Sequence, residues 1–219
     1  MPAMPRRDAP GPRRVVVATH SSHKLRELRE LLAVPGLELV SLDDLGIAGE
    51  PVEDGATFEA NARIKARFAA RASGLPALAD DSGIEVEALG GRPGVHTRRY
   101  AGPTATDPEN NAKLLSELAG LPAERRAARY VCVLTLALPD AAAPGGLRLV
   151  SRRGTCRGRI AASPRGKGGF GYDPIFEPAP EPPGGWTFGQ YTAAEKHAIS
   201  HRARAARRMA VVLRGIDPA

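Results

Sequence analysis

The clearest structural signal lies in residues 14–33, which read RVVVATHSSHKLRELRELLA. The apolar run from Arg14 to Thr19 predicts a buried strand. The segment from Ser21 to Ala33 has the spacing of a helix whose N-cap is Ser21 or Ser22. A strand that passes through a short polar turn into a helix is the building unit of α/β folds. This opening therefore predicts an α/β protein.

The same alternation continues along the chain. Further strands are predicted at residues 39–42, 76–79, 84–88, 130–138 and 147–159, and further helices at residues 57–73, 108–119 and 193–214. Thr57 and Gly74 supply the expected cap residues of the second helix. The last two strands should form a long hairpin. We therefore expect a mixed twisted sheet with flanking helices.

Composition places the chain among globular proteins. Its 219 residues are 42% hydrophobic and 25% charged, which fits one folded domain. We expect a disordered basic, proline-rich tail at residues 1–13 and one folded domain at residues 14–217. No apolar run approaches the ~18 residues of a membrane helix. With two cysteines and no signal-peptide pattern, a cytoplasmic protein is the expectation.

The net charge of +7 is concentrated in two places, the N-terminal tail and residues 195–214. Such a charge can indicate nucleic-acid binding, but an arginine run is more often a solvated helix face. Lysine is rare by contrast, and occurs only at positions 24, 65, 113, 167 and 196. We therefore expect the lysines to be the cations with specific roles.

The turn between the first strand and helix is a candidate anion site. It comprises Thr19, His20, Ser21, Ser22, His23 and Lys24. Free N–H groups and the helix dipole both favour a phosphate at a helix N-terminus. Lys24 falls on the same side of the helix as Leu28 and Leu31. The structural alternative is a lysine that extends past apolar neighbours to water.

The second helix places two polar side chains on its apolar side. Its arginines share the outer face, whereas Asn61 and Lys65 lie inward at spacing i, i+4. Inward polar groups need partners. They are either a second phosphate-binding pair or a satisfied core hydrogen bond or ion pair.

Two adjacent carboxylates, Asp80 and Asp81, follow a predicted strand and precede Ser82. Neighbouring strand residues point to opposite faces, so one of them should face any given site. A carboxylate at a strand end can hold Mg²⁺ or accept a proton from water. The acidic loop with Glu50, Glu53 and Asp54 could add a second metal ligand. The alternative is an ordinary Asp-Ser-Gly turn.

Residues 165–174, RGKGGFGYDP, contain the spacing G-x-G-x-x-G. A dinucleotide-binding loop should open a helix, whereas Pro174 indicates extended chain, so we reject that interpretation. No P-loop pattern is present either. Phe170 could stack on a nucleobase or lie in the core. His197 and His201 have the spacing of a zinc pair but lack an evident third ligand.

Taken together, the chain resembles the inosine and xanthosine triphosphate pyrophosphatases, which act on noncanonical purine nucleotides. The resemblance covers residues 14–214. It rests on the blocks VVVATHSSHKLRELRELL, TFEANARIKARFAA, ALADDSGIEVEALGGRPGVHTRRYAG, GKGGFGYDPIF and TAAEKHAISHR. It implies two lobes around a central substrate cleft, a homodimer, and Mg²⁺-dependent cleavage of dITP, ITP or XTP to the monophosphate and pyrophosphate.

The resemblance also assigns roles by motif. The triphosphate would be held by Thr19, His20, Ser21, Ser22, His23 and Lys24, with support from Asn61 and Lys65. Glu53 and Asp81 would bind the metal, Asp81 would be the catalytic base, and Ser82 would contact the substrate. The nucleoside would be held by Phe170, Gly171, Tyr172, Asp173, Lys196, His201 and Arg202.

The chain departs from the family pattern at two places. Ser21 stands where the first motif usually has Asn, and Thr97-Arg98-Arg99 stands where the third block usually has Ser-Ala-Arg. Serine has one hydroxyl in place of an amide, so a side-chain contact with the substrate at Ser21 does not carry over from the family.

Arg202 has only donors, which suits the 6-oxo group of hypoxanthine or xanthine and leaves a donor unpaired against adenine. GTP shares the 6-oxo group and would have to be excluded by shape. Two alternatives stay open: a pyrophosphatase of the same fold that acts on dTTP or UTP, and a nucleic-acid-binding module that uses residues 195–214.

Overall fold

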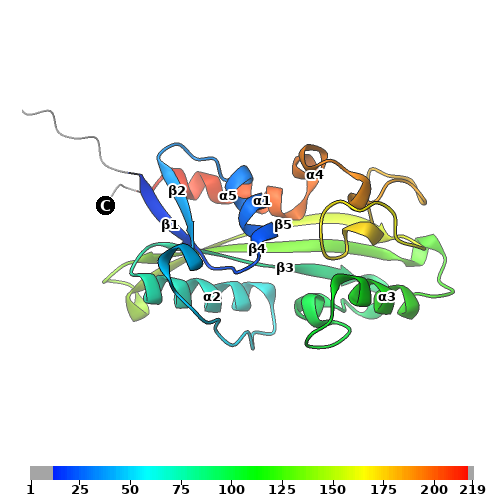
Figure 1. The fold of residues 1–219 in the computed structure, drawn as a ribbon, viewed down its shortest axis with the longest axis horizontal. Helices are drawn as coiled ribbons and strands as arrows, with labels where there is room; N and C mark the ends of the chain where they lie inside the picture. The colour runs from blue at the N-terminus through cyan, green and yellow to red at the C-terminus, as the bar shows by residue number, and fades with distance from the viewer. Residues whose placement is uncertain (1–11, 217–219) are drawn as a thin grey trace, which may run out of the picture.

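A computed structural model describes residues 12–216 of the chain. Its centre is a six-stranded sheet in the order β2-β1-β3-β4-β5-β6 (Figure 1). The strands are β1 (Arg13–Val17), β2 (Leu37–Ser41), β3 (Ala77–Val86), β4 (Ala127–Pro139), β5 (Leu147–Ile160) and β6 (Phe176–Pro178). β1 runs parallel to β2 and β3, and the other pairs are antiparallel. The prediction of a mixed sheet is confirmed.

Five α-helices flank the sheet in the described residues. They are α1 (Ser22–Leu31), α2 (Phe58–Ser73), α3 (Asp107–Glu117), α4 (Ala193–Ile199) and α5 (His201–Arg214). Figure 1 shows α2 and α3 on one face of the sheet and α1, α4 and α5 on the other. Short 3₁₀ helices lie in the connections, among them η3 (Gly94–Arg99). No helix within residues 12–216 is long and apolar enough to cross a membrane.

Residues 1–11, and with them most of the predicted tail, and residues 217–219 lie outside the described residues. Arg13, which the prediction placed in the tail, is the first residue of β1, and its guanidinium donates to the Leu213 carbonyl at 3.2 Å. The caps of the second helix are confirmed, because the Thr57 side chain accepts from the Ala60 N–H and Gly74 ends α2 in the left-handed region. The hairpin of β4 and β5 is confirmed as well.

The prediction of two strands at residues 76–79 and 84–88, separated by a turn, is wrong. β3 runs unbroken through Asp80, Asp81 and Ser82, because β4 pairs with it along its whole length. Gly83 does not mark a turn. A Cβ at this position would lie 2.6 Å from Thr97 Oγ1, so the glycine permits the close approach of η3 to the strand.

The prediction of one helix over residues 193–214 is also wrong. Ser200 has an extended backbone, ends α4 and begins α5. Its N–H donates to the Lys196 carbonyl at 2.8 Å, and its Oγ accepts from the Ala203 N–H at 3.2 Å. A single residue therefore caps two helices. The apolar face of α5, which includes Ala203, Ala206, Met209 and Leu213, is buried.

The apolar core is divided along the length of the sheet. At one end Val17, Leu28 and Met209 belong to a cluster between α1, α5 and the sheet. At the other end the aromatic rings of Tyr130 and Phe176 pack beside α3 and the segment that follows β5. Buried charged side chains lie between these clusters. This division matches the two lobes that the resemblance implies.

Candidate active site

A cavity of about 360 Å³ opens between the two lobes. Every predicted site residue lines it except Asn61 and Asp81. Glu50 of the acidic loop lines it as well, and so do further residues that the sequence did not indicate as site residues: Ala18, Leu42, Gly49, Pro51, Phe68, Gly83, Thr97, Arg98, Asp107 and Tyr130. The structure thus brings segments from the whole length of the chain to one place.

The cavity lies beside an open edge of β3. β1 pairs with β3 only at Ala77 and Leu78, and the Ala18 N–H donates to the Leu78 carbonyl at 2.8 Å. The chain then turns away at Thr19. Within the described residues no strand continues beside β3 on this edge, so the space is left to the β1–α1 turn and to a ligand.

The β1–α1 turn is shaped by its own hydroxyl groups. Thr19 Oγ1 accepts from the Ser21 N–H at 3.1 Å, and Ser21 Oγ caps α1 by accepting from the Lys24 N–H at 3.4 Å. Serine and asparagine are both good N-caps, so Ser21 keeps the helix start that the usual Asn would provide. The first residues of α1, Ser22, His23 and Lys24, line the cavity, and a helix N-terminus favours an anion.

Asp80 and Asp81 point to opposite faces of the sheet, as strand alternation predicts. Asp80 contacts Lys24 from α1 and Arg202 from α5, whereas Asp81 contacts Lys65 from α2. They do not end a strand. The two carboxylates therefore belong to two different ion clusters, one on each side of β3.

The first cluster is a buried chain of alternating charge, which we call the charge chain. Its members, in order of contact, are Lys24, Asp80, Arg202, Glu27, Lys196 and Asp173. Lys24 Nζ lies 2.8 Å from Asp80 Oδ1, and Arg202 Nε lies 2.8 Å from Asp80 Oδ2. Arg202 Nη1 also contacts the Glu27 carboxylate. These ion pairs join α1, β3 and α5 across the floor of the cavity.

The charge chain ends at the glycine-rich segment. Lys196 Nζ lies 2.9 Å from Glu27 Oε1 and 2.7 Å from Asp173 Oδ2. Burial opposes ionisation of Glu27, but Arg202 and Lys196 outweigh it and lower the pKa of this carboxyl to about 2. For Asp173 burial is the stronger effect, and its pKa is raised despite Lys196. Three of the four predicted substrate-binding cations, Lys24, Lys196 and Arg202, thus have carboxylate partners inside the charge chain.

Asp80 is fully enclosed in this cluster. Burial alone would raise the pKa of its carboxyl, yet the charges of Arg202 and Lys24 hold that pKa well below its usual range. Asp80 also accepts from Ser82 Oγ at 2.8 Å. Its oxygens are therefore occupied, which makes it a structural anion rather than a base.

The second cluster is smaller and consists of Asp81, Lys65 and Glu53. Lys65 Nζ lies 2.7 Å from Asp81 Oδ1 and 3.1 Å from Glu53 Oε2. Burial raises the pKa of Asp81 even though Lys65 opposes this shift. The two carboxylates outweigh burial for Lys65 and raise its pKa. Asp81 does not line the cavity itself, but the ammonium group it contacts does.

Glu53 and Asp81 have the donor chemistry that suits Mg²⁺. Both present carboxylate oxygens to the same small volume, which a cation already occupies in the form of the Lys65 ammonium group. Among residues 12–216 no group of three or more His, Cys, Asp or Glu converges. Mg²⁺ needs only one or two carboxylates, because water and substrate phosphates complete its shell.

Asn61 makes the buried hydrogen bond that the sequence left open as the alternative to phosphate binding. It is buried, and its Oδ1 accepts from the Gly55 N–H at 2.8 Å. This bond holds the acidic loop that carries Glu53 against the start of α2. Asn61 therefore acts on the loop and does not line the cavity.

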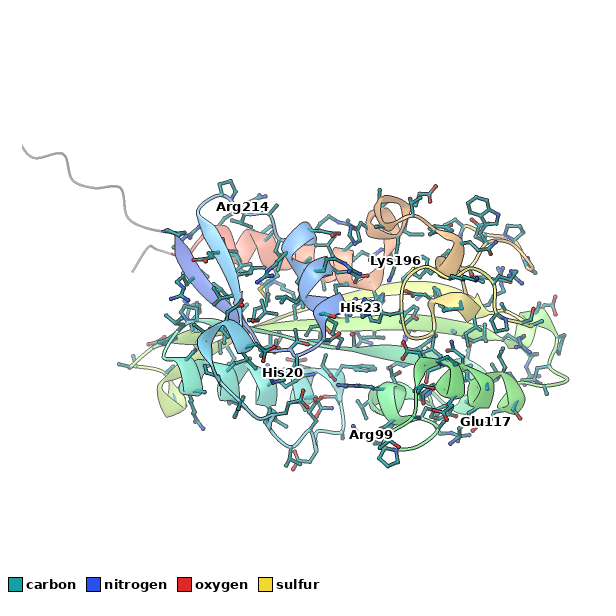
Figure 2. All side chains as sticks on the ribbon, viewed as in Figure 1. His20, His23, Arg99, Glu117, Lys196 and Arg214 are labelled. Atoms are coloured by element: carbon teal, nitrogen blue, oxygen red, sulfur yellow. The ribbon has the colours of Figure 1, made fainter. Side chains whose placement is uncertain are left out.

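Phe170 supplies an aromatic face to the cavity and is half-buried. The His23 ring stacks on it at 5.4 Å, and Lys196 Nζ lies 4.8 Å from the ring centroid. Figure 2 shows Lys196 beside His23, with His20 farther along the turn before α1. Phe170 is thus a cavity residue and not a core residue.

His201 is buried and lines the cavity. Its ring stacks on Tyr130 at 4.5 Å between centroids. Burial, Arg202 and Lys196 hold the pKa of His201 well below its usual value, so the ring is neutral. His197 lies on the other helix, with Nδ1 3.6 Å from Glu30. The two histidines therefore do not share a helix face.

Arg202 is almost completely buried. Its guanidinium donates to Asp80, to Glu27 and, at 2.9 Å, to Ser82 Oγ. Its Cζ lies 5.5 Å from the Phe170 centroid. Most donors that we expected to read the 6-oxo group are therefore committed to protein acceptors.

Glu27 and Asp80 are the structural anions that sequence reasoning missed. Glu27 is three residues after Lys24, so the helix-face argument that turned Lys24 inward also turns Glu27 inward. For Asp80 the signal was strand alternation, which separates it from Asp81. Thr97, Arg98 and Asp107 carried no local signal, because distant loops bring them to the cavity.

The fold and the cavity define an α/β protein with a cation-rich cleft that carries an aromatic face. A sequence model of the Ham1 family matches residues 15–212. The dITP/XTP pyrophosphatase of Syntrophobacter fumaroxidans is 50% identical over 191 residues, which cover 87% of this chain and 78% of that protein.

Two solved structures are also similar. The HAM1 protein from Coxiella burnetii has a TM-score of 0.81 and 39% identity, over 93% of this chain and 100% of that one. The nucleoside-triphosphatase and dITP/XTP pyrophosphatase from Mycobacterium abscessus has a TM-score of 0.70 and 42% identity, over 91% and 98%. The chain belongs to the Ham1 family. The predicted family, its fold class and its nature as a hydrolytic enzyme are confirmed.

Proposed function

We propose that this chain hydrolyses the noncanonical purine nucleotides dITP, ITP and XTP to the nucleoside monophosphate and pyrophosphate, and that the reaction requires Mg²⁺. The names of the relatives support the substrate class. The observation that carries the proposal is that one cavity joins Lys65, with Asp81 and Glu53 behind it, to the ring of Phe170. Such a cavity has a cationic part for phosphates and an aromatic part for a base.

The residues that line or adjoin the cavity have separate roles in this proposal. Lys24, Lys65 and the N-terminus of α1 hold the phosphates, because phosphoryl transfer depends on positioning and charge neutralisation. Glu53 and Asp81 hold Mg²⁺, which supplies further positive charge at the phosphates when bound. Asp81 accepts the proton of the attacking water, and its raised pKa suits a base. Phe170 stacks on the nucleobase.

Steady-state kinetics with a pyrophosphate readout tests this proposal. We expect ITP, XTP and dITP to be cleaved at least about tenfold more efficiently than ATP, GTP, dTTP or UTP, a difference of roughly 1.4 kcal/mol. Removal of Mg²⁺ should abolish turnover. Equal rates on dTTP or UTP, or release of orthophosphate in place of pyrophosphate, would contradict it.

No contact in the described residues favours the nucleic-acid alternative. Two exposed arginines of α5 donate to strand carbonyls of β5, Arg204 to Thr155 at 3.0 Å and Arg208 to Arg153. These hydrogen bonds engage both guanidinium groups with the backbone of β5. A nucleic-acid-binding module would show tight binding with a steep salt dependence, which a binding titration across salt concentrations would measure.

The position of Asn61 gives a prediction about metal affinity. Substitution Asn61→Ala removes the acceptor of the Gly55 N–H and frees the loop that carries Glu53. We expect the Mg²⁺ concentration for half-maximal activity to rise severalfold, by the equivalent of about one hydrogen bond. The ITP affinity at saturating Mg²⁺ should stay unchanged. A raised KM for ITP at saturating Mg²⁺ would instead indicate direct contact with the triphosphate.

We also propose that the chain forms a homodimer, as the resemblance implies. The proposal concerns the assembly alone and assigns no surface. Light scattering coupled to gel filtration should give twice the chain mass of 23.1 kDa, and a monomer mass at micromolar concentration would disprove it.

A further inference from the structure

The peptide that follows Phe170 is held by two side chains of α3. The Gly171 N–H donates to Asp107 Oδ2 at 2.7 Å, and Asn111 Nδ2 donates to the Gly171 carbonyl at 3.1 Å. Both polar groups of one backbone residue are therefore bonded to side chains of α3. Gly171 has a φ of 63°, in the left-handed region that favours glycine. The two bonds fix this conformation.

Asp107 and Asn111 act from a rigid platform. They lie four residues apart, so they share one face of α3. The helix begins with a capping box between Thr106 and Glu109. Asn110, which is buried, accepts from the Ala101 N–H at 2.8 Å and so ties the helix to the segment after η3. We call the pair Asp107 and Asn111 the α3 clamp.

The α3 clamp acts next to the aromatic face of the cavity. The Phe170 N–H donates to Asp173 Oδ2 at 2.9 Å on one side, and the clamp holds the following residue on the other. Beyond it, the Tyr172 hydroxyl donates to the Thr97 carbonyl at 2.8 Å. The position of the Phe170 ring is therefore set jointly by the bond to Asp173 and by α3.

We propose that Asp107 and Asn111 are positioning residues that fix the Phe170 ring and thereby set the affinity for the nucleobase. The clamp contacts Gly171, whereas Asp81 and Glu53 contact Lys65 of α2, and no hydrogen bond or ion pair joins the two groups in the described residues. Loss of the clamp should therefore weaken base binding and leave phosphate chemistry intact. The identity of the base as hypoxanthine rests on the proposed function, and the positional role of the clamp does not.

The test uses two variants, Asp107→Ala and Asn111→Ala, and two ligands. Inosine monophosphate reports on the base, and inorganic pyrophosphate with Mg²⁺ reports on the phosphate part alone. Calorimetry should show a roughly tenfold weaker Kd for inosine monophosphate in each variant, the equivalent of one hydrogen bond to a charged or buried group. The pyrophosphate Kd should be unchanged. In turnover, KM for ITP should rise while kcat stays within about twofold.

Amide hydrogen exchange separates this role from general destabilisation. Both variants should exchange faster in a peptide that covers residues 165–173, with unchanged protection in β3 and β4. Asp107→Asn keeps an acceptor oxygen and should restore wild-type affinity. Lys113→Ala is the matched control, because it removes an exposed side chain of the same helix that donates to the Tyr100 carbonyl.

Two results would overturn the proposed role of the α3 clamp. One is unchanged exchange of residues 165–173 in both variants. The other is weaker inosine monophosphate binding in Asp107→Ala alone, which would indicate that Asp107 touches the ligand directly. Failure of the wild-type protein to bind inosine monophosphate would instead overturn the proposed function, and the exchange data would still decide whether the clamp holds the loop.

Discussion

Substitution Asp81→Asn should abolish pyrophosphate release, with a loss in kcat on the order of 10³-fold. Asparagine has the size of aspartate but accepts no proton and lacks the charge that a metal needs. The protein should stay folded, with a change in unfolding free energy of about 1 kcal/mol or less. Burial already disfavours the ionised form of Asp81, and Lys65 keeps Glu53 as its partner.

The control is Asp140→Asn, which removes a carboxylate from an exposed pair with Arg148 at the end of the β4–β5 hairpin. It should leave kcat and stability unchanged. Circular dichroism and denaturant unfolding would verify the fold of both variants. An Asp81→Asn enzyme that retains a tenth or more of wild-type activity would show that another group activates the water.

Substitution Glu27→Gln should have the largest effect on stability. Glu27 is the anion between Lys196 and Arg202 in the charge chain, so its loss leaves two buried cations with reduced compensation. Removing one partner of such a buried pair costs about 3–5 kcal/mol. Urea unfolding at pH 7 should show this difference from the wild type. Glu30→Gln, on the exposed side of α1, is the matched control and should cost less than about 1 kcal/mol.

The effect of Glu27 should depend on pH in a defined direction. Its pKa is lowered from 4.5 to about 2 in the folded protein, so its charge stabilises the fold above pH 4.5. This stabilisation, about 3 kcal/mol, is lost as the pH falls from 4.5 to 2. The gap between wild type and Glu27→Gln should therefore close over this interval. A gap that is constant from pH 7 to pH 2.5 would contradict the assignment.

The sequence predicted the elements whose signals are local. Thr57 and Gly74 bound α2 because capping depends on a few neighbouring residues. The break in β3 was predicted wrongly, since Ser82 and Gly83 have turn propensity and the pairing partner, β4, lies about 50 residues away. Tertiary pairing outweighs propensity in such a strand.

In the site, too, the sequence predicted the features that depend on neighbouring residues. The inward direction of Lys24 and Lys65 follows from helical periodicity, and both line the cavity. Their partners did not follow, because an ion pair between α1 and β3 depends on how the elements pack. Asn61 shows the same limit, since its inward direction was predicted but its contact with the Gly55 N–H needed the course of the acidic loop.

The break at Ser200 determines where two cations can meet. In one continuous helix, residues 196 and 202 would be separated by six steps of 100°, and would point about 120° apart. With the backbone extended at Ser200, Lys196 and Arg202 converge on the two oxygens of a single carboxylate, Glu27. The extended residue Ser200 therefore sets the direction of α4 relative to α5. Adding or deleting one residue at Ser200 would turn Lys196 away from Arg202. One of the two cations would then no longer reach Glu27, although each helix would stay intact.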